Sequence, residues 1–192
     1  MHAEVASRAP HARKHGTTFA ESWTSADGAT IVAVGAVLAG SDPVVVADLL
    51  RTGARALVTS RKALAVALGA LDRVVQKHAK EHRDDALAAA VMLLAFARNA
   101  QDVDLAGAGQ LHAALIDGSG AQHALHGRAG ALGTGIEPND LIEHVHLRRD
   151  DIVVVATVPL DHEWWASGNR AAEALLHRST ASDASVAIVT VG

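Results

Sequence analysis

Long apolar runs separated by short polar breaks predict a chain built of buried strands and amphipathic helices. Residues 30–38 (TIVAVGAVL) are continuously apolar and rich in β-branched side chains, which is typical of a strand buried on both faces. A shorter strand is expected over residues 19–23, and the turn signal Ala-Asp-Gly at residues 26–28 predicts a hairpin between the two. Residues 1–15 are polar and rich in histidine, so we expect a flexible lead-in there, with a first edge strand as the alternative.

Two consecutive helices are expected after this hairpin. The first begins at residues 41–43 (Ser-Asp-Pro), where small polar residues precede a proline in the first turn, and it runs through Leu57. Thr59 or Ser60 is expected to cap the second helix. That helix carries leucine and valine at helical spacing and ends in the charged stretch 77–85.

Residues 86–97 (ALAAAVMLLAFA) are ambiguous, because alanine, leucine and methionine favour helix whereas the run has no polar face. We interpret this region as two strands, 87–96 and 102–106, against the local helix preference. An amphipathic helix is expected over residues 162–179, and a glycine-rich loop over residues 127–138. The remaining strands are predicted at residues 112–116, 142–147, 152–156 and 186–191.

Helices and strands therefore come in blocks and do not alternate along the chain. This order favours packed sheets covered by helices over a doubly wound parallel sheet. The length of 192 residues fits one domain, which we place at residues 16–192. Cysteine is absent, which excludes disulfides and thiolate metal sites.

Charge and hydropathy argue against two classes of partner. The net charge is −4 and the basic residues are scattered, so the electrostatic footprint of a nucleic-acid-binding protein is missing. The longest apolar run is too short to span a bilayer, and the N-terminal residues lack the apolar core of a secretion signal. We therefore expect a cytoplasmic protein with no membrane and no nucleic-acid partner.

Five segments follow one another in an order and spacing that carry a family resemblance. They are 19–23 (FAESW), 31–40 (IVAVGAVLAG), 106–116 (AGAGQLHAALI), 150–160 (DDIVVVATVPL) and 182–191 (SDASVAIVTV). Together they resemble the metal-dependent PPM-type serine/threonine phosphatases, and most closely the short bacterial branch that includes the sporulation stage II protein E domain and RsbX. The resemblance implies an α+β fold, a four-layer α-β-β-α sandwich of two mainly antiparallel sheets flanked by helices.

Enzymes of this family hold two divalent cations, usually manganese or magnesium, on oxygen ligands between the sheets, and the cations activate a water that attacks the phosphoester. By this resemblance the metal-pocket positions of the present chain are Glu21, Gly35, Ala36, Val158, Pro159, Ser182 and Asp183. Glu21 aligns with the first metal aspartate, whereas Gly35, Val158 and Ser182 stand at the other three. The pocket is therefore interpreted as vestigial, and no bound metal is expected.

Two histidine pairs and a glycine-rich segment could bind a metal or a phosphate, but we interpret them as structural. His78 and His82 stand four positions apart on a predicted helix, and His144 and His146 share one face of a predicted strand. We interpret both pairs as solvated surface, with metal binding as the alternative. The segment 130–135 (GALGTG) lacks the Lys-Ser/Thr that completes a phosphate-binding loop.

Trp164 and Trp165 are adjacent on a predicted helix, so both cannot face the core. An exposed tryptophan is a candidate anchor for a protein partner, and burial of both rings in a groove is the alternative.

Three functional hypotheses follow. The first is a catalytically impaired phosphatase-like regulator that binds a protein in a bacterial partner-switching or stress-response pathway. For its partner the resemblance implies a STAS-domain antagonist, a switch kinase or a sigma-factor regulator. The second is an active phosphoserine/phosphothreonine protein phosphatase in which Glu21 and Asp183 hold one weakly bound Mn²⁺ or Mg²⁺. The third is a structural subunit, a homodimer formed through the helix that carries Trp164.

Overall fold

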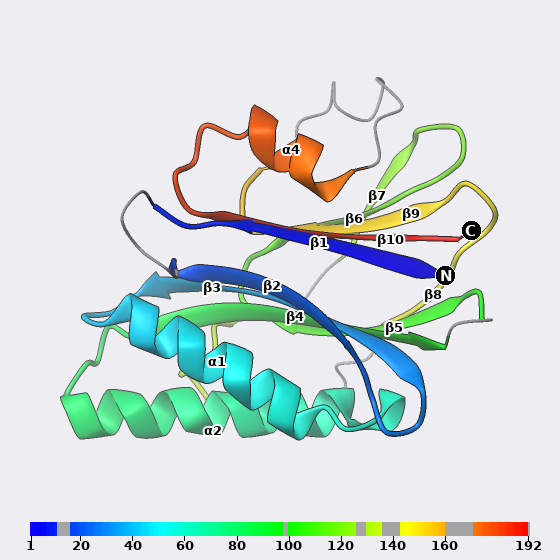
Figure 1. Ribbon diagram of the computed structural model, residues 1–192. Helices are drawn as coiled ribbons and strands as arrows, with labels where there is room; N and C mark the ends of the chain where they lie inside the picture. Colours follow the sequence, from blue (N-terminus) through cyan, green and yellow to red (C-terminus); the bar gives the residue numbers. More distant parts are fainter. Residues whose placement is uncertain (11–15, 98–99, 126–129, 136–142, 160–170, 192) are drawn as a thin grey trace.

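Two antiparallel five-stranded sheets lie face to face, and helices cover their outer surfaces (Figure 1). The structure is a computed structural model that describes residues 1–10, 16–97, 100–125, 130–135, 143–159 and 171–191. The layers follow one another as helix, sheet, sheet and helix, which confirms the α-β-β-α sandwich expected from the sequence.

Sheet A runs in the order β1 (His2–Arg8), β10 (Ala184–Thr190), β9 (Ile152–Ala156), β6 (His112–Ile116) and β7 (Gln122–Ala124). Sheet B runs in the order β2 (Thr18–Thr24), β3 (Ala29–Ala39), β4 (Ala88–Ala97), β5 (Asp102–Ala108) and β8 (Glu143–His146). Helix α1 (Pro43–Leu57), the 3₁₀ turn η1 (Arg61–Ala63) and helix α2 (Leu64–His82) cover sheet B, and α4 (Ala172–Arg178) covers sheet A.

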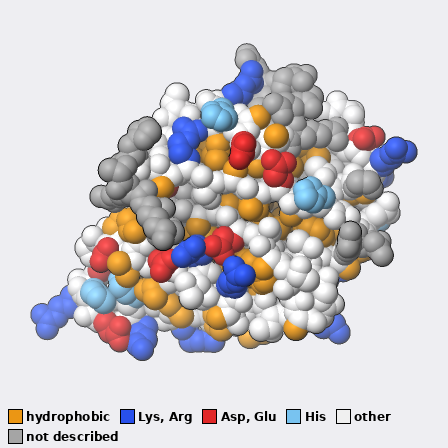
Figure 2. Space-filling view, viewed as in Figure 1, with side chains coloured by type: hydrophobic (Ala, Val, Ile, Leu, Met, Phe, Trp, Pro, Cys, Tyr) orange, Lys and Arg blue, Asp and Glu red, His pale blue; other side chains and the backbone are white. Residues whose placement is uncertain are grey.

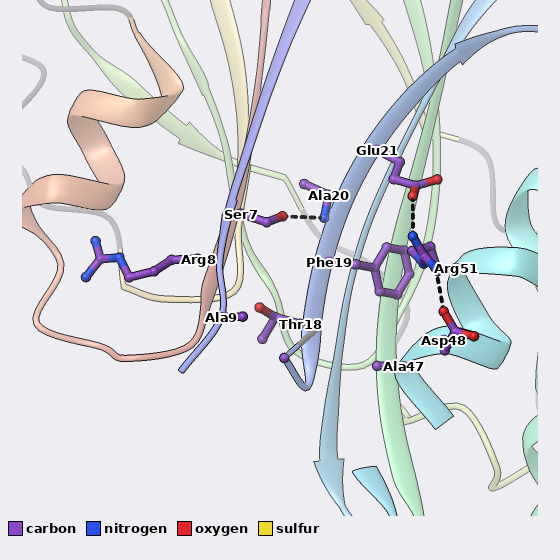
Figure 3. Close-up of a pocket in the computed structure, with 11 residues that line it drawn as sticks. Ser7, Arg8, Ala9, Thr18, Phe19, Ala20, Glu21, Ala47, Asp48 and Arg51 are labelled. Atoms are coloured by element: carbon purple, nitrogen blue, oxygen red, sulfur yellow. Dashed lines mark hydrogen bonds and ion pairs between the residues drawn. The ribbon is translucent and has the colours of Figure 1, made fainter. Parts of the chain in front are cut away.

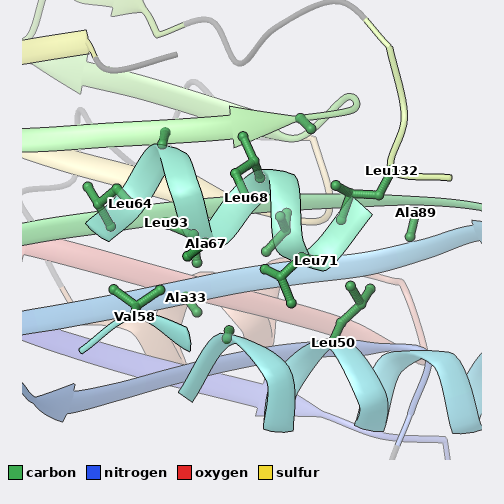
Figure 4. Packing of buried hydrophobic residues seen from close by; sticks show 14 of the residues in the cluster. Ala33, Leu50, Val58, Leu64, Ala67, Leu68, Leu71, Ala89, Leu93 and Leu132 are labelled. Atoms are coloured by element: carbon green, nitrogen blue, oxygen red, sulfur yellow. The ribbon is translucent and has the colours of Figure 1, made fainter. Parts of the chain in front are cut away.

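The central strands of sheet B, β3 and β4, are buried on both faces. On β3, Val32 and Val34 pack between the sheets, whereas Ile31 and Ala33 pack against α1 and α2. The alternation continues on β4, so these two strands separate two hydrophobic cores (Figure 4 shows the one under the helices). This placement explains the continuous apolar runs, because a strand with two buried faces needs no polar face.

The strand interpretation of residues 87–96 is confirmed, although residue preference favours a helix there. β4 pairs with β3 on one side and with β5 on the other, and its side chains are buried on both faces. The hairpin between β2 and β3 is also confirmed, with Gly28 at a φ of +79° in its turn. Tertiary packing therefore overrides the weak local preference of alanine and leucine.

The expected start of α1 is confirmed, with Asp42 at the N-cap and Pro43 in the first turn, whereas the expected cap of α2 is wrong. Asp42 precedes α1 without a side-chain capping bond, and Ser41 instead donates from its N–H and its hydroxyl to Asp84 at 2.6 and 2.9 Å. Neither Thr59 nor Ser60 caps α2, because the 3₁₀ turn η1 intervenes and Ser60 makes no side-chain capping bond to it.

The flexible lead-in expected over residues 1–15 is wrong for residues 2–8, which form β1 at the edge of sheet A; the alternative, a first edge strand, is the arrangement found there. Of the helix predicted over residues 162–179, the structure describes α4 from Ala172 to Arg178, and residues 160–170 lie outside the described part. Within the described ranges, no helix has the length and apolarity needed to cross a membrane.

Truncating a side chain in the helix-covered core should destabilise the fold strongly. Leu68 on α2 is fully buried among leucines and alanines (Figure 4), so Leu68→Ala should lower the free energy of unfolding by about 2–5 kcal/mol. Val66 on the same helix is 68% exposed, so Val66→Ala should change it by less than about 0.5 kcal/mol. Urea denaturation measures both values, and equal losses would contradict the assigned orientation of α2.

Candidate functional site

The outer edges of the two sheets lie beside each other along β1 and β2, and a cavity opens there (Figure 3). Each of these strands is the last of its sheet, and the N–H of Ala20 on β2 donates to Ser7 Oγ on β1 at 3.0 Å. The cavity has a volume of about 230 Å³. Its lining comes from the end of β1, from residues 18–21 of β2 and from α1, including Arg51.

The pleat of β2 divides its side chains between two environments. Ala20 packs with the core between the sheets, so Thr18 also points towards sheet A. Phe19 and Trp23 pack with the core under the helices, so Glu21 between them lies on the helix-covered face. Glu21 therefore does not point towards the space between the sheets, where the resemblance placed the metal pocket.

Asp183 lies behind the cavity wall that Gly16 and Thr18 form. Its Oδ2 accepts hydrogen bonds from Thr17 N at 2.5 Å and from Thr17 Oγ1 at 2.9 Å. Its Oδ1 accepts one from Thr18 Oγ1 at 2.7 Å. The carboxylate is thus stabilised by donors from one short segment of chain, which occupy most of its acceptor sites.

A chain of hydroxyls continues from this carboxylate across the space between the sheets. Thr18 Oγ1 lies 2.9 Å from Ser185 Oγ, which in turn lies 2.8 Å from Ser7 Oγ. Ser185 is fully buried, so these contacts satisfy a hydroxyl that water does not reach. The hydroxyl chain joins β2 of sheet B to β1 and β10 of sheet A. We call these hydroxyls and the carboxylate that they reach the polar seam, which is formed by Ser7, Thr17, Thr18, Asp183 and Ser185.

Glu21 is neutralised by arginines of α1. Arg51 Nη1 donates to Glu21 Oε1 at 3.0 Å, and Arg55 Nη1 lies 3.9 Å from Glu21 Oε2. Arg51 also donates to Asp48 at 2.5 Å, and this bond is the main cause that raises the pKa of Arg51 above its ordinary value. On the face viewed in Figure 2, charges of both signs are interspersed with apolar side chains.

Gly35 and Ala36 on β3 lie opposite Phe19 and Thr18 of β2. The Phe19 ring fills the space over Gly35, because a Cβ at position 35 would lie 2.5 Å from Phe19 Cζ. Ala36 is buried and has a methyl group as its whole side chain. Neither residue supplies a ligand side chain, and the ring occupies the space that a longer side chain at position 35 would need.

The other predicted pocket residues are dispersed. Val158 is buried in the core between sheet A and α4, whereas Pro159 is exposed. Ser182 is exposed next to Asp183. Trp164 and Trp165, the predicted partner-binding residues, lie outside the described residues.

Sequence reasoning missed an ion-pair cluster around a buried aspartate near the opposite edge of sheet B. Asp104 on β5 accepts hydrogen bonds from Arg61 Nε, from Arg61 Nη2 at 2.9 Å and from His144 Nδ1 at 2.6 Å. Burial by itself raises the pKa of Asp104, but the bonds from Arg61 and His144 together hold it below its ordinary value. In the sequence, the signal for this cluster was a charged residue, Asp104, between two core residues of a predicted strand. In the structure, Asp104 lies on the face of sheet B that η1 reaches.

Comparison with known proteins identifies relatives of this fold. The family model described as Stage II sporulation protein E (SpoIIE) matches residues 27–186 of the chain. No curated protein matches the sequence.

Solved structures of bacterial signalling proteins share the architecture. A serine/threonine phosphatase of S. agalactiae has a TM-score of 0.81 at 11% identity, with 100% of this chain and 99% of that chain covered. RsbX in complex with magnesium has a TM-score of 0.73 at 12% identity, covering 96% and 92%. The RsbU and RsbW domains of a Mycobacterium tuberculosis protein have a TM-score of 0.73 at 18% identity, covering 97% of this chain and 59% of theirs.

The described residues around the cavity do not fit the cation site of such relatives. Magnesium and manganese are held by several carboxylate and carbonyl oxygens that converge on one point. Here Asp183 is occupied by Thr17 and Thr18, and Glu21 faces α1. Across the described ranges, no group of three His, Asp or Glu side chains is arranged to hold a metal ion.

Adding a side chain at Gly35 should reveal the packing of Phe19. Gly35→Ala should destabilise the fold by about 1–3 kcal/mol, because the new Cβ overlaps the buried ring. In a Phe19→Leu background the same substitution should cost less, since the overlapping atoms are gone. Chemical denaturation of the wild type, the two single variants and the double variant gives their free energies of unfolding. An equal loss of stability on Gly35→Ala in both backgrounds would contradict the packing of Phe19 over Gly35.

The Asp104 cluster should make stability depend on pH. Because the folded-state pKa of Asp104 is below its ordinary value of 3.8, ionisation stabilises the fold above that pH and stabilises it less as pH falls through the folded pKa. Asp104→Asn should therefore be less stable than the wild type at pH 7, with a deficit that shrinks in acid. Asp85→Asn, at an exposed aspartate, is the control and should show no such trend in denaturant titrations.

Proposed function

The chain belongs to the stage II sporulation protein E (SpoIIE) family of PPM-type serine/threonine phosphatases, and from this premise we propose that it is a catalytically impaired member that acts by binding a protein. The observation that carries the proposal is the polar seam. Beside the cavity, the carboxylate of Asp183 is hydrogen-bonded within the protein, and the neighbouring β3 positions are Gly35 and Ala36.

Electrostatics supports this proposal. Two divalent cations a few ångströms apart repel strongly, and several carboxylates must offset that repulsion in a site shielded from water. A cation at Asp183 would have to displace the donors of Thr17 and Thr18, and Glu21 is already paired with Arg51. In this interpretation hydrogen bonds hold the two sheets together at the position where relatives place their cations.

The partner class is inferred from the family. RsbU and RsbW domains and a structure from work on the bacterial stressosome are among the solved structures that share this fold. We propose a bacterial signalling role in the cytoplasm, with a STAS-domain antagonist, its switch kinase or a sigma-factor regulator as partner. The cavity between β1 and β2 is the proposed seat for the partner's serine-containing loop, and Trp164 and Trp165 are proposed as further anchors on the basis of the sequence.

Metal binding, turnover and complex formation together test the proposal. Calorimetric titration of Mn²⁺ into the protein should give no heat of binding, and a phosphoserine STAS-domain protein should keep its phosphate. The same STAS-domain protein should bind, and Trp164→Ala should weaken the complex about tenfold or more, as loss of a central aromatic anchor does. Glu21→Ala should leave the complex unchanged.

The opposite pattern would favour an active phosphatase with an atypical site. Binding of one or two equivalents of Mn²⁺, with phosphate release that Glu21→Ala abolishes and Trp164→Ala spares, would overturn the proposal. The homodimer hypothesis stays a separate prediction, and a doubled mass that does not change with concentration would support it.

A further inference from the structure

Two histidines occupy the edge strand of sheet B that lies farthest from the cavity. His144 and His146 are two positions apart on β8, so they share one face of the strand. In the register of the sheet they stand opposite Asp104 and Asp102 on β5. Each histidine therefore has a carboxylate of the neighbouring strand directly beside it.

Both rings are oriented by these carboxylates. His144 Nδ1 lies 2.6 Å from Asp104 Oδ1, and His146 Nδ1 lies 2.8 Å from Asp102 Oδ1. An ionised carboxylate only accepts hydrogen bonds, so each Nδ1 carries the proton and the neutral ring keeps its lone pair on Nε2. The side chains of His144 and His146 are 72% and 60% exposed, so a solvated ion can reach them.

We propose that His144 and His146 form a binding site for a borderline-soft divalent cation, with Zn²⁺ as the representative ion. Zinc-bound histidines typically donate their second ring N–H to a carboxylate, a backbone carbonyl or water, which fixes the tautomer and raises the basicity of the ligating nitrogen. Successive same-face residues of a strand are about 7 Å apart, so binding of one ion requires both imidazoles to incline towards it. Water molecules supply the remaining ligands of the ion in this two-histidine site.

This site selects a different class of cation from the one held by phosphatase relatives. Imidazole nitrogen suits zinc, copper and nickel, whereas magnesium and manganese prefer oxygen ligands. The site lies on the edge of sheet B opposite the polar seam and uses none of its residues. The inference is therefore independent of whether the chain is an active phosphatase.

The other histidine pair lacks these features and provides a matched control. His78 and His82 on α2 stack with ring centroids 4.1 Å apart and an interplanar angle of 22°. The in-plane lone pairs of the two stacked rings therefore lie in nearly parallel planes. His82 Nδ1 bonds to the backbone carbonyl of His78 at 3.1 Å, so the partner of this nitrogen is a neutral carbonyl and not a carboxylate.

Calorimetric titration of ZnCl₂ into protein without a histidine tag tests the inference. The wild type should bind about one Zn²⁺ at pH 7, and His144→Gln or His146→Gln should weaken binding at least about tenfold. Asp102→Asn should also weaken it, by about 10- to 100-fold, because the orienting carboxylate is lost while both ligands remain. His78→Gln should bind like the wild type, and Mn²⁺ should give no heat that depends on His144.

Three results would overturn the site. They are no zinc binding by the wild type, wild-type affinity in both β8 variants, and loss of binding in His78→Gln. Circular dichroism of each variant distinguishes loss of ligands from loss of fold, and the exposure of both histidines predicts unchanged spectra.

Discussion

The burial of β3 and β4 on both faces is the constraint on which the rest of the molecule depends. Two strands without a polar face require one cover from sheet A and another from α1 and α2, so the sandwich follows from them. Polar groups are correspondingly displaced to the margins of sheet B. The cavity and the polar seam lie at its β2 edge, and the Asp104 cluster with the β8 histidines lies at the other.

The polar seam has both a structural and a functional meaning. Each of its hydrogen bonds contributes about 0.5–1.5 kcal/mol net, and rather more where the carboxylate accepts. Removing Ser7 or Thr18 should cost more than the bond itself, because the buried hydroxyl of Ser185 would keep only one of its two hydroxyl partners. A seam of this kind holds the sheets together without a cation, and it also ties up the carboxylate that metal-dependent catalysis would use.

The sequence predicted most of the fold because periodicity and β-branching report burial directly, as in residues 30–38. It failed at the cap of α2, because the 3₁₀ turn η1 separates Thr59 and Ser60 from that helix. The sequence did not show which face of β2 carries Glu21, because a shift of one residue along a strand moves a side chain to the other face. Asp104 was missed because its partners come from η1 and β8, far away in sequence.

The pairing of β1 with β10 has a consequence for synthesis on the ribosome. Ser7 and Ser185 touch across a separation of 178 residues, so β1 has no paired strand until β10 has been synthesised. Closing so long a loop carries an entropic cost that only complete sheet formation offsets, which slows folding. Until then the unpaired edges of β1 and β10 are open to other nascent chains, and this fold should depend on chaperones that shield them.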